Sequence, residues 1–283
     1  MSSIGAVVIT RNEARNIEAC LRGLSFCSQR VVVDSFSEDE TTELARPHAD
    51  KIYRRSFTSW GEQKNWALEQ LDTEWALIVD ADERVGEALS REILQVVETG
   101  RFDAYWIRRN NHFFGRPIRG AGWNRDRVLR LLRLGAGNYD ERWVHEEIRL
   151  LPGRSAGELE HRLDHFSYED WPSTFARMSA YSSRGAADAV AAGKRAPIWR
   201  LALAPSLRFW KQYLLQGGYR DGVHGLVLCG LGASQLFLKL AKMRLRELPV
   251  TSRTEGAVEV EIVQGPAPTG MAAERPDGKK ENA

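Results

Sequence analysis

Cysteine is scarce in this chain. Three cysteines occur among 283 residues, at Cys20, Cys27 and Cys229. Their odd number excludes a fully paired disulfide scaffold, and their wide spacing matches no zinc-binding motif. We therefore expect reduced thiols and a cytosolic setting.

Long apolar runs are also lacking. Residues 1–5 have neither the basic region nor the apolar core of a signal peptide. The most apolar stretch, Val223–Leu238, has 16 residues, which is short of the roughly 20 that a bilayer-spanning helix needs. The sequence thus predicts a protein that faces the cytoplasm and does not cross the membrane.

The chain has no strong net charge. Forty Lys and Arg oppose 38 Asp and Glu, which leaves a formal +2. The segment Arg101–Arg133 is different, because it holds nine Arg against only Asp103 and Asp126 and is interleaved with aromatic residues. Such a segment suits an anionic ligand, although it is also compatible with a solvated strand face. No nucleic-acid-binding signature accompanies it, and Arg equally suits phosphates and phosphosugars, so we expect no nucleic-acid partner.

The first hundred residues alternate strand-like and helix-like segments. Short apolar runs predict strands, and apolar residues three and four apart predict helices. Repeated βα units of this length imply an α/β fold with a mostly parallel sheet and helices on both faces. The predicted strands are Ile4–Thr10, Arg30–Asp34, Lys51–Tyr53 and Glu74–Val79, and the predicted helices are Asn12–Leu24, Glu38–Arg46, Trp60–Leu71 and Glu87–Val97.

After residue 100 the pattern changes to strands separated by Gly-rich turns. We interpret these strands as mixed or antiparallel additions that close over a ligand crevice. The chain then has a βα half at 1–100 and a mixed-sheet half of the same domain at 101–170. The added strands are predicted at Ala104–Arg108, Val128–Arg133, Val144–Leu151 and Leu159–Phe166.

Helices return at residues 171–248, and a tail follows at 249–283. The last two helices mix Trp, Phe and Leu with basic residues, as helices in a membrane interface do. Ordinary amphipathic packing on the domain is the alternative, and both can hold together. The tail has few large apolar residues beyond Val258–Val263, which predicts disorder. The helices are predicted at Trp171–Ala192, Ile198–Gln216 and Gly222–Glu247.

Carboxylates directly follow the fourth predicted strand. The run Trp75–Val79 is apolar and continues as Asp80-Ala81-Asp82-Glu83-Arg84. Ligands of open α/β sheets bind at the carboxyl ends of strands, and at a turn Asp80 and Asp82 can both face one divalent cation. Its natural companion is a pyrophosphate. Asp-x-Asp alone is a weak signal, since acids also follow strands as solvated turn residues.

Polar residues at other strand ends accompany these carboxylates. The first strand runs into Thr10-Arg11-Asn12-Glu13 and the second into Asp34-Ser35-Phe36-Ser37. Together with Asp80-Ala81-Asp82 they resemble the nucleotide-sugar-binding half of family 2 glycosyltransferases. Over about residues 4–245 the chain is similar to the branch that contains the lipopolysaccharide-core β-1,4-glucosyltransferases. The motifs of that branch are Gly61–Asn65, Asp80–Arg84, Gly122–Asp126, Leu129–Arg133 and Val144–Glu146.

The resemblance implies a GT-A-type nucleotide-binding sandwich and a nucleotide-sugar donor, with UDP expected. Thr10 and Glu13 match residues that contact the nucleoside. Asp34 matches the acid that recognises base or ribose. This chain has Phe36 where many relatives carry Gly, and because Phe does not easily take a positive φ, we expect a differently shaped loop there.

The resemblance also implies a divalent metal, Mg²⁺ or Mn²⁺. Asp82 matches the direct metal ligand, and Asp80 would hold the ribose or a metal-bound water. A cation held by carboxylates stabilises the charge that develops on a departing nucleoside diphosphate. Lys64 is expected to add a second positive contact, unless it is a solvated helix lysine. Glu83 and Arg84 are expected to start the following helix.

An inverting transfer needs a general base for the acceptor hydroxyl. Glu146 is the first candidate, because it follows a strand downstream of the metal motif. Asp126 is the second, although neighbouring Arg residues should lower its pKa and make it a poorer base. His145 is a candidate contact to the pyrophosphate or the metal. His161 and His165 invite a zinc interpretation, but without further partners a structural role is favoured, with His165 kept as a minor candidate for contact with the diphosphate or the metal.

The leading hypothesis is a metal-dependent inverting glycosyltransferase that extends a lipid-linked or anionic saccharide, such as a lipopolysaccharide core, at the inner leaflet of the membrane. One alternative is an Asp-x-Asp phosphohydrolase, which is disfavoured because the first strand ends in Thr10 rather than in a nucleophilic Asp. Another is a non-catalytic nucleotide-sugar-binding membrane adaptor.

Overall fold

The computed structural model describes residues 2–140, 147–245 and 258–265. Its centre is a parallel sheet of four strands, β1 (Ile4–Thr10), β2 (Gln29–Asp34), β3 (Lys51–Arg55) and β4 (Trp75–Asp80), in the order β3-β2-β1-β4. Every residue of β1 is buried. A strand buried on both faces reads as a continuous apolar run, which explains its sequence.

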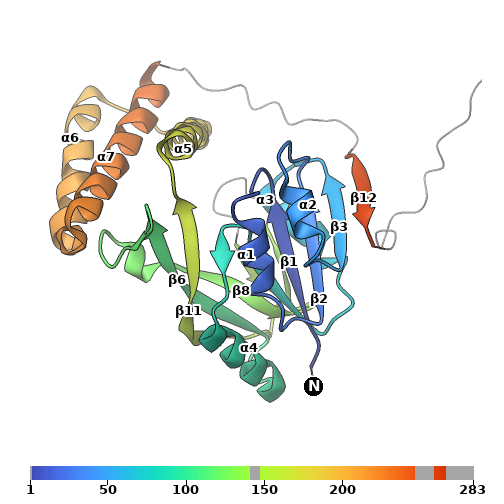
Figure 1. Ribbon diagram of the computed structural model, residues 1–283. Coiled ribbons are helices and arrows are strands. Elements are labelled where there is room, and N and C mark those ends of the chain that lie inside the picture. The colour runs from blue at the N-terminus through green and yellow to red at the C-terminus, as the bar shows by residue number, and fades with distance from the viewer. Residues whose placement is uncertain (1, 141–146, 246–257, 266–283) are drawn as a thin grey trace, which may run out of the picture.

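Helices cover both faces of this sheet (Figure 1). On one face, α1 (Ile17–Arg22), α2 (Thr41–Ala45) and α4 (Glu87–Thr99) bury apolar residues such as Leu21 and Ile93. On the other face, α3 (Trp60–Leu68) contributes Ala67 and Leu68 to a second cluster. The predicted α/β class with helices on both faces is confirmed.

Beyond β4 the sheet becomes mixed. The strand β8 (Arg127–Arg133) runs antiparallel to β4 and to β6 (Ala104–Phe113), and β6 pairs in parallel with β11 (Ala156–Tyr168). The short strand β5 (Glu83–Arg84) pairs with β11 and so returns the chain after β4 to the far end of the sheet. Smaller elements are β7 (Arg116–Pro117), η1 (Trp123–Arg125), β9 (Gly137–Tyr139) and β10 (Ile148–Leu150).

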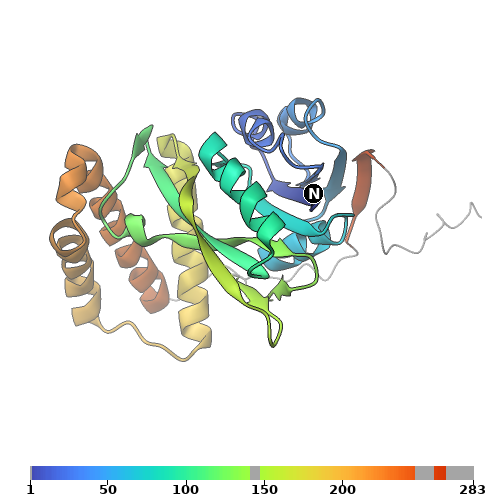
Figure 2. The same cartoon turned by 90° about the horizontal axis from the view of Figure 1, so that it is seen from below.

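A helical layer follows β11. It contains α5 (Trp171–Ala191), α6 (Ile198–Trp210), the π-helix η2 (Lys211–Leu215), η3 (Gly218–Asp221) and α7 (Gly222–Leu245). Ala186 and Ala189 of α5 pack on Leu240 and Met243 of α7. Figures 1 and 2 show α6 and α7 side by side, at the end of the molecule far from β3.

One of these helical segments, Gly218–Leu245, is long and apolar enough to cross a membrane by length and composition, and 22% of its most apolar window is buried. The apolar stretch Val223–Leu238 alone predicts a helix that is too short to span a bilayer. The helical segment is longer than that stretch, because polar residues at both ends continue it.

The stretch predicted as a disordered tail contains a strand. Residues Val260–Gln264 form β12, which pairs antiparallel with β3 at the edge of the sheet. Val263 packs against the main core. The prediction of disorder is therefore wrong for this segment, because its apolar residues pair with a strand that lies more than 200 residues earlier in the chain. Gln264 likewise donates to the carbonyl of Ala49, at a separation of 215 residues.

Candidate active site

The polar strand ends singled out in the sequence meet at one edge of the sheet. In the parallel register Thr10 lies opposite Asp34, and Ile9 lies opposite Asp80. The carboxyl ends of β1, β2 and β4 are therefore neighbours. This is the edge at which open α/β sheets bind ligands.

Thr10 has a buried hydroxyl at this edge. The residue is 5% exposed, and within the described part of the chain its Oγ1 has no hydrogen-bond partner. Its carbonyl accepts from the backbone N–H of Ser35 at 2.8 Å. A buried hydroxyl without a partner carries a free-energy cost that a ligand or a water can remove. The nucleoside contact predicted for Thr10 fits this position.

Asp34 is fully buried and organises the loop that follows it. Its carboxylate accepts from the backbone N–H of Ser37 at 2.9 Å and also from the Ser37 hydroxyl. The Arg54 guanidinium lies 3.4 Å away. The role of Asp34 toward base or ribose stays a prediction.

Phe36 occupies this loop with a φ of +55°. The expectation that Phe would avoid this conformation and reshape the loop is wrong. The left-handed region costs a non-glycine residue about 1–2 kcal/mol, and neighbouring contacts offset that cost. Arg54 lies 5.6 Å from the centroid of the Phe36 ring, while Asn12 joins the two loops by donating to Ser37 Oγ at 2.8 Å and accepting from Glu38 N at 2.9 Å.

Asp80 is surrounded by cations. Its carboxylate pairs with the Arg130 guanidinium and lies 3.4 Å from Nζ of Lys64, and both cationic side chains are 4% exposed. Burial would raise the pKa of Asp80, but the charges of Arg130 and Lys64 overcome it and hold that pKa well below its usual range. Lys64 is thus not a solvated helix lysine, and Arg130 is a site residue that the sequence did not single out.

Glu83 is part of this cluster rather than the start of a helix. Its side chain is fully buried and accepts from the backbone N–H of Asp80 at 2.9 Å, from Arg130 at 3.0 Å and from Arg109 at 3.3 Å. Together with Arg84 it forms β5. The sequence prediction for Glu83 and Arg84 is therefore wrong, because acids after a strand resemble a helix start when the distant partner β11 is not visible.

Asp82 has a different environment from Asp80. It is 8% exposed, and its Oδ2 accepts from the Ser167 hydroxyl at 3.0 Å, with Arg177 at 3.4 Å and Nε2 of His165 at 3.6 Å. The carbonyl of Asp82 accepts from Phe166 N at 2.8 Å. The end of β11 therefore fixes the Asp-x-Asp turn.

The donor set at Asp82 fits a divalent metal that is completed by substrate. Magnesium in phosphate-binding sites is held by one or two carboxylates together with substrate phosphates and waters. In the described residues no three His, Cys, Asp or Glu side chains converge as a preformed cage. Asp82 supplies a carboxylate, whereas the Asp80 carboxylate is already paired with Arg130 and Lys64.

Arg177 reaches the site from α5. Its guanidinium lies 3.6 Å from Glu13 as well as 3.4 Å from Asp82. Glu13 also accepts from the Asn16 amide at 2.9 Å, and burial raises the pKa of Glu13. Arg177 had no sequence signal, since it lies in the predicted helix Trp171–Ala192, in which no residue was identified as a site candidate.

Asp126, the second base candidate, is held by two donors. Arg109 Nε donates to its carboxylate at 2.8 Å and Asn111 at 2.9 Å. Burial raises the pKa of Asp126, but the hydrogen bond and charge of Arg109 prevail and lower it. The expectation of a lowered pKa agrees with this. The side-chain Oδ1 of Asn111 lies 2.6 Å from Nδ1 of His165, so a continuous chain of contacts links Asp126 to the Asp82 side of the site.

Glu146 and His145 lie outside the described residues. Tyr139 and Asp140, the last described residues before the gap at 141–146, are held by the Gly61–Asn65 motif. Asn65 exchanges two hydrogen bonds with the backbone of Tyr139, at 2.8 and 3.0 Å, and Gly61 leaves no room for a Cβ beside the carbonyl of Asp140. The motif therefore positions β9 next to Lys64, whose Nζ lies 5.1 Å from the centroid of the Tyr139 ring.

The His161 and His165 side chains have different partners. His161 lies 2.8 Å from Glu92 of α4, and His165 contacts Asn111 and Ser167. Asp164 contacts Asn110 and His112. These contacts give the three side chains structural partners, as the sequence analysis favoured over a zinc site.

The sequence of this chain matches a known protein family and several known proteins. A model described as glycosyl transferase family 2 matches residues 6–150. A Rhizobium meliloti (strain 1021) protein, lipopolysaccharide core biosynthesis glycosyltransferase LpsC, is 29% identical over 251 residues, which cover 86% of this chain and 92% of that protein. A Rickettsia felis protein described as an uncharacterized glycosyltransferase is 27% identical over 272 residues, covering 90% of this chain and 95% of its own.

Likenesses among solved structures are distant. The structure of S. aureus TarS 1–349 in complex with UDP-GlcNAc has a TM-score of 0.46 at 11% identity and covers 86% of this chain and 92% of that one. A Mycobacterium tuberculosis glucosyl-3-phosphoglycerate synthase in complex with Mg²⁺ and UDP has a TM-score of 0.34 at 18% identity, with coverages of 39% and 44%.

Proposed function

The chain belongs to glycosyl transferase family 2, and on that premise we propose that it moves a hexose from a UDP-sugar to a lipid-linked saccharide acceptor of the lipopolysaccharide-core type, with inversion and with help from a divalent metal. The observation that carries the proposal is the convergence of Thr10, Asp34, Asp80 and Asp82 at one sheet edge, beside the buried cations Lys64 and Arg130. Membership of this family of glycosyltransferases disfavours the phosphohydrolase and the non-catalytic adaptor.

In this proposal the donor lies across the ends of β1, β2 and β4. Thr10, Glu13 and Asp34 contact the nucleoside, and Asp80 contacts the ribose. Lys64 and Arg130 keep Asp80 ionised and fixed in place, and they make this edge attractive to a diphosphate. Glu83 holds the turn that carries Asp80 and Asp82.

Asp82 is the proposed protein ligand of Mg²⁺ or Mn²⁺. The bound metal supplies Lewis-acid stabilisation of the charge on the departing diphosphate. Arg177 lies against Asp82 and Glu13 on the same side, so its guanidinium offsets part of the negative charge of the two carboxylates.

Glu146 is the proposed general base for the acceptor hydroxyl, and it stays a prediction from sequence. The surroundings of Asp126 support this choice, because a carboxylate with a lowered pKa and two donors already bound is a weak proton acceptor. We expect Glu146→Gln to keep its affinity for UDP and to lose transfer by at least a hundredfold. Full activity of that variant would move the assignment to Asp126, and His145 remains a candidate contact to the diphosphate.

Residues 101–170 are proposed to form the acceptor side, with exposed Arg residues such as Arg116, Arg119 and Arg125 facing an anionic saccharide. The hairpin of α6 and α7 is proposed to hold the enzyme peripherally on the cytoplasmic face of the inner membrane. Its outer face supports this, since Trp199, Leu203, Leu207 and Trp210 are all more than half exposed. Aromatic, aliphatic and basic residues together are typical of interfacial helices.

A panel of nucleotide sugars tests the donor assignment. UDP-, GDP-, ADP- and CMP-linked sugars are titrated calorimetrically, each with Mn²⁺ and with a chelator. We expect UDP-hexoses to bind at least tenfold more tightly with metal. Binding of another nucleotide class, or equal binding in the chelator, would contradict the assignment.

Asp82→Asn tests the metal ligand. We expect the variant to lose metal-dependent UDP binding while its circular dichroism is unchanged, because an amide is a neutral and weaker ligand than a carboxylate. Asp164→Asn is the matched control, since Asp164 is another β-sheet aspartate but contacts Asn110 and His112. Equal metal dependence in Asp82→Asn and the native chain would rule out Asp82 as the ligand.

A further inference from the structure

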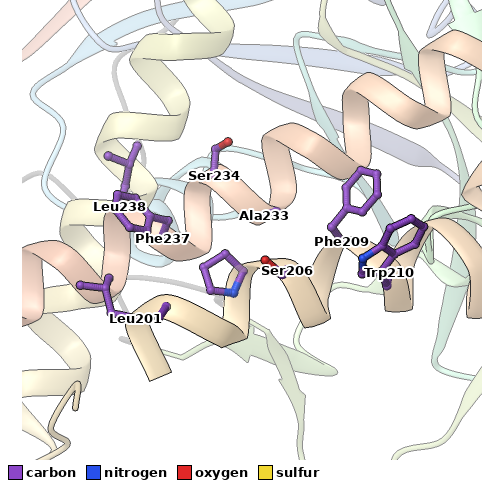
Figure 3. A pocket seen from close by; sticks show the side chains of 10 residues that line it. Leu201, Ser206, Phe209, Trp210, Ala233, Ser234, Phe237 and Leu238 are labelled. Atoms are coloured by element: carbon purple, nitrogen blue, oxygen red, sulfur yellow. The ribbon is translucent and has the colours of Figure 1, made fainter. Parts of the chain in front are cut away.

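A groove of about 580 Å³ lies between α6 and α7. One wall is formed by Leu201, Pro205 and Trp210 of α6, and the other by Phe237 and Leu238 of α7. Figure 3 shows these two helices with side chains from both reaching into the space between them. None of the described residues that line the groove is charged, and its volume is in the range of small-molecule sites, about 300–1,000 Å³.

The sequence explains why these helices leave space. At the base of the hairpin the backbones of η3 and α7 touch, since a Cβ on Gly225 of α7 would collide with the carbonyl of Gly218 of η3. Further along, small residues contribute to both walls of the groove, with Ser206 on α6 and Ala233 and Ser234 on α7. Pro205 inside α6 removes a helical hydrogen bond, and the π-helix η2 follows soon after. Both irregularities work against regular close packing of the two helices.

We propose that this groove binds one hydrocarbon chain of the lipid that carries the saccharide acceptor; the proposal rests on the proposed function. The exposed face of α6 suffices to hold the hairpin on a bilayer. A walled groove goes further, because it fixes a single chain relative to the protein.

The charge of the α6–α7 hairpin indicates that the hydrocarbon chain belongs to an anionic lipid. The hairpin and the turn before it carry one acidic residue, Asp221, which is engaged with the backbone N–H groups of Arg119 and Gly120 at 3.0 and 2.7 Å. Basic residues surround the uncharged groove in sequence, and each one near an anionic surface adds about 1 kcal/mol of attraction. They are Lys194, Arg195, Arg200, Arg208, Lys211, Arg220, Lys239, Lys242 and Arg244.

The groove is also connected to the acceptor side of the active site. Phe209, which lines the groove, belongs to the same apolar cluster as Phe113, Trp123 and Tyr168. Trp123 and Tyr168 lie 5.5 Å apart between ring centroids, and Ser167, which precedes Tyr168 in β11, donates its hydroxyl to Asp82 Oδ2 at 3.0 Å. A chain held at Phe209 therefore places the attached saccharide on the side of the molecule that carries Asp82.

Direct chain binding is the first test. The full-length protein, without donor or vesicles, is titrated with saturated fatty acids of eight to sixteen carbons that displace a fluorescent fatty acid, all below their critical micelle concentrations. Each buried CH₂ should strengthen binding about fourfold, until the groove is filled and the affinity levels off. No dependence on chain length would overturn the proposal.

Groove-filling variants locate the binding site. We expect Ala233→Trp to weaken the longest chain at least tenfold, and Ser206→Trp to act in the same way from the opposite wall. Leu207→Trp is the matched control, since Leu207 lies on the same helix, is 68% exposed and does not line the groove. Urea midpoints and UDP affinity identify a variant that fails to fold, in which case the other one decides. Unchanged binding in a folded groove variant, or equal loss in Leu207→Trp, would overturn the proposal.

The acceptor is the second test. A lipopolysaccharide-core acceptor is compared with the same saccharide after complete removal of its acyl chains. We expect the native protein to show a KM at least tenfold lower for the acylated acceptor than for the deacylated one. Ala233→Trp should remove that difference with kcat unchanged. Equal KM values in the native chain would overturn the assignment to the acceptor. The fatty-acid titration is made without donor, so it still tests the groove if the proposed transferase activity fails.

Discussion

Asp80 and Asp82 are two residues apart, and their carboxylates are neutralised by neighbouring cations to different degrees. Asp80 contacts Arg130 and Lys64, whereas Asp82 contacts a hydroxyl, an imidazole and the half-buried Arg177. A carboxylate that is already neutralised by two cations gains less from a metal ion than one that is only partly compensated. This difference explains physically why the second acid of the motif is the better candidate ligand.

Glu83 is predicted to be the main stabilising residue of this turn. Its fully buried carboxylate faces Arg130 and Arg109, and breaking a buried ion pair costs about 3–5 kcal/mol because an uncompensated charge is left behind. We therefore expect Glu83→Gln to lower the free energy of unfolding by about 3 kcal/mol in urea titrations. Glu87→Gln is the control, since Glu87 forms a surface pair with Arg91 and should change stability by less than about 0.5 kcal/mol. Similar small losses in both variants would contradict the prediction.

The lowered pKa of Asp126 predicts that the stability of the fold depends on pH. Its pKa in the folded protein is lowered by the hydrogen bond and charge of Arg109, which outweigh burial. A depressed pKa stabilises the fold above the unfolded value, 3.8, and this contribution is lost as the pH falls through the folded value. We expect Asp126→Asn to be less stable than the native chain at pH 7, and the difference to shrink below pH 3.8. Urea midpoints at pH 7, 5, 4 and 3 measure it, and a gap that widens in acid would show the opposite sign.

At the scale of elements, local sequence pattern was enough for most of the sheet. The four parallel strands follow from apolar runs, and their polar ends identified Thr10, Asp34 and Asp80 as neighbours. Of the cationic partners only Lys64 was singled out from the sequence, because Arg130 contacts Asp80 across 50 residues and Arg177 contacts Asp82 across 95. Local periodicity carries no information about which distant strand or helix packs beside a loop. The same limit applies to Glu83 and to β12.

The edge strand β12 is predicted to contribute modestly to stability. Val263 packs on the core while its neighbour Ile262 is 43% exposed. Removing partly buried aliphatic surface at about 25 cal/mol per Å² costs about 1 kcal/mol. We expect Val263→Ser to lose about 1 kcal/mol in urea titrations and Ile262→Ser to lose less than half of that. Equal effects would mean that strand pairing, rather than side-chain packing, holds β12.

At the scale of the whole molecule, two regions with different surfaces are joined. The α/β half buries its apolar residues on both faces of one sheet, whereas α6 exposes Leu203 and Leu207 at 56% and 68%, and η2 exposes Leu214 at 53%. A contiguous exposed apolar surface on a soluble protein marks a binding face. Asp221 connects the two regions, since it ties the start of α7 to the loop before Trp123. The membrane contact proposed for the hairpin would therefore lie close to the proposed acceptor side of the site.

Vesicle binding tests this division of the molecule. We expect the full chain to sediment with vesicles that contain anionic lipid, and binding to weaken as salt shortens the Debye length from about 10 Å at 0.1 M to about 3 Å at 1 M. Replacing Leu203, Leu207 and Leu214 together by Gln should weaken binding at least a hundredfold, because burying a Leu side chain is worth about 1.5–3 kcal/mol. Leu94→Gln combined with Leu151→Gln is the matched control, since these two are 41% and 50% exposed but lie outside the hairpin. If the triple variant sediments like the native chain, or if the control loses binding equally, the exposed surface of α6 and η2 does not contact the membrane.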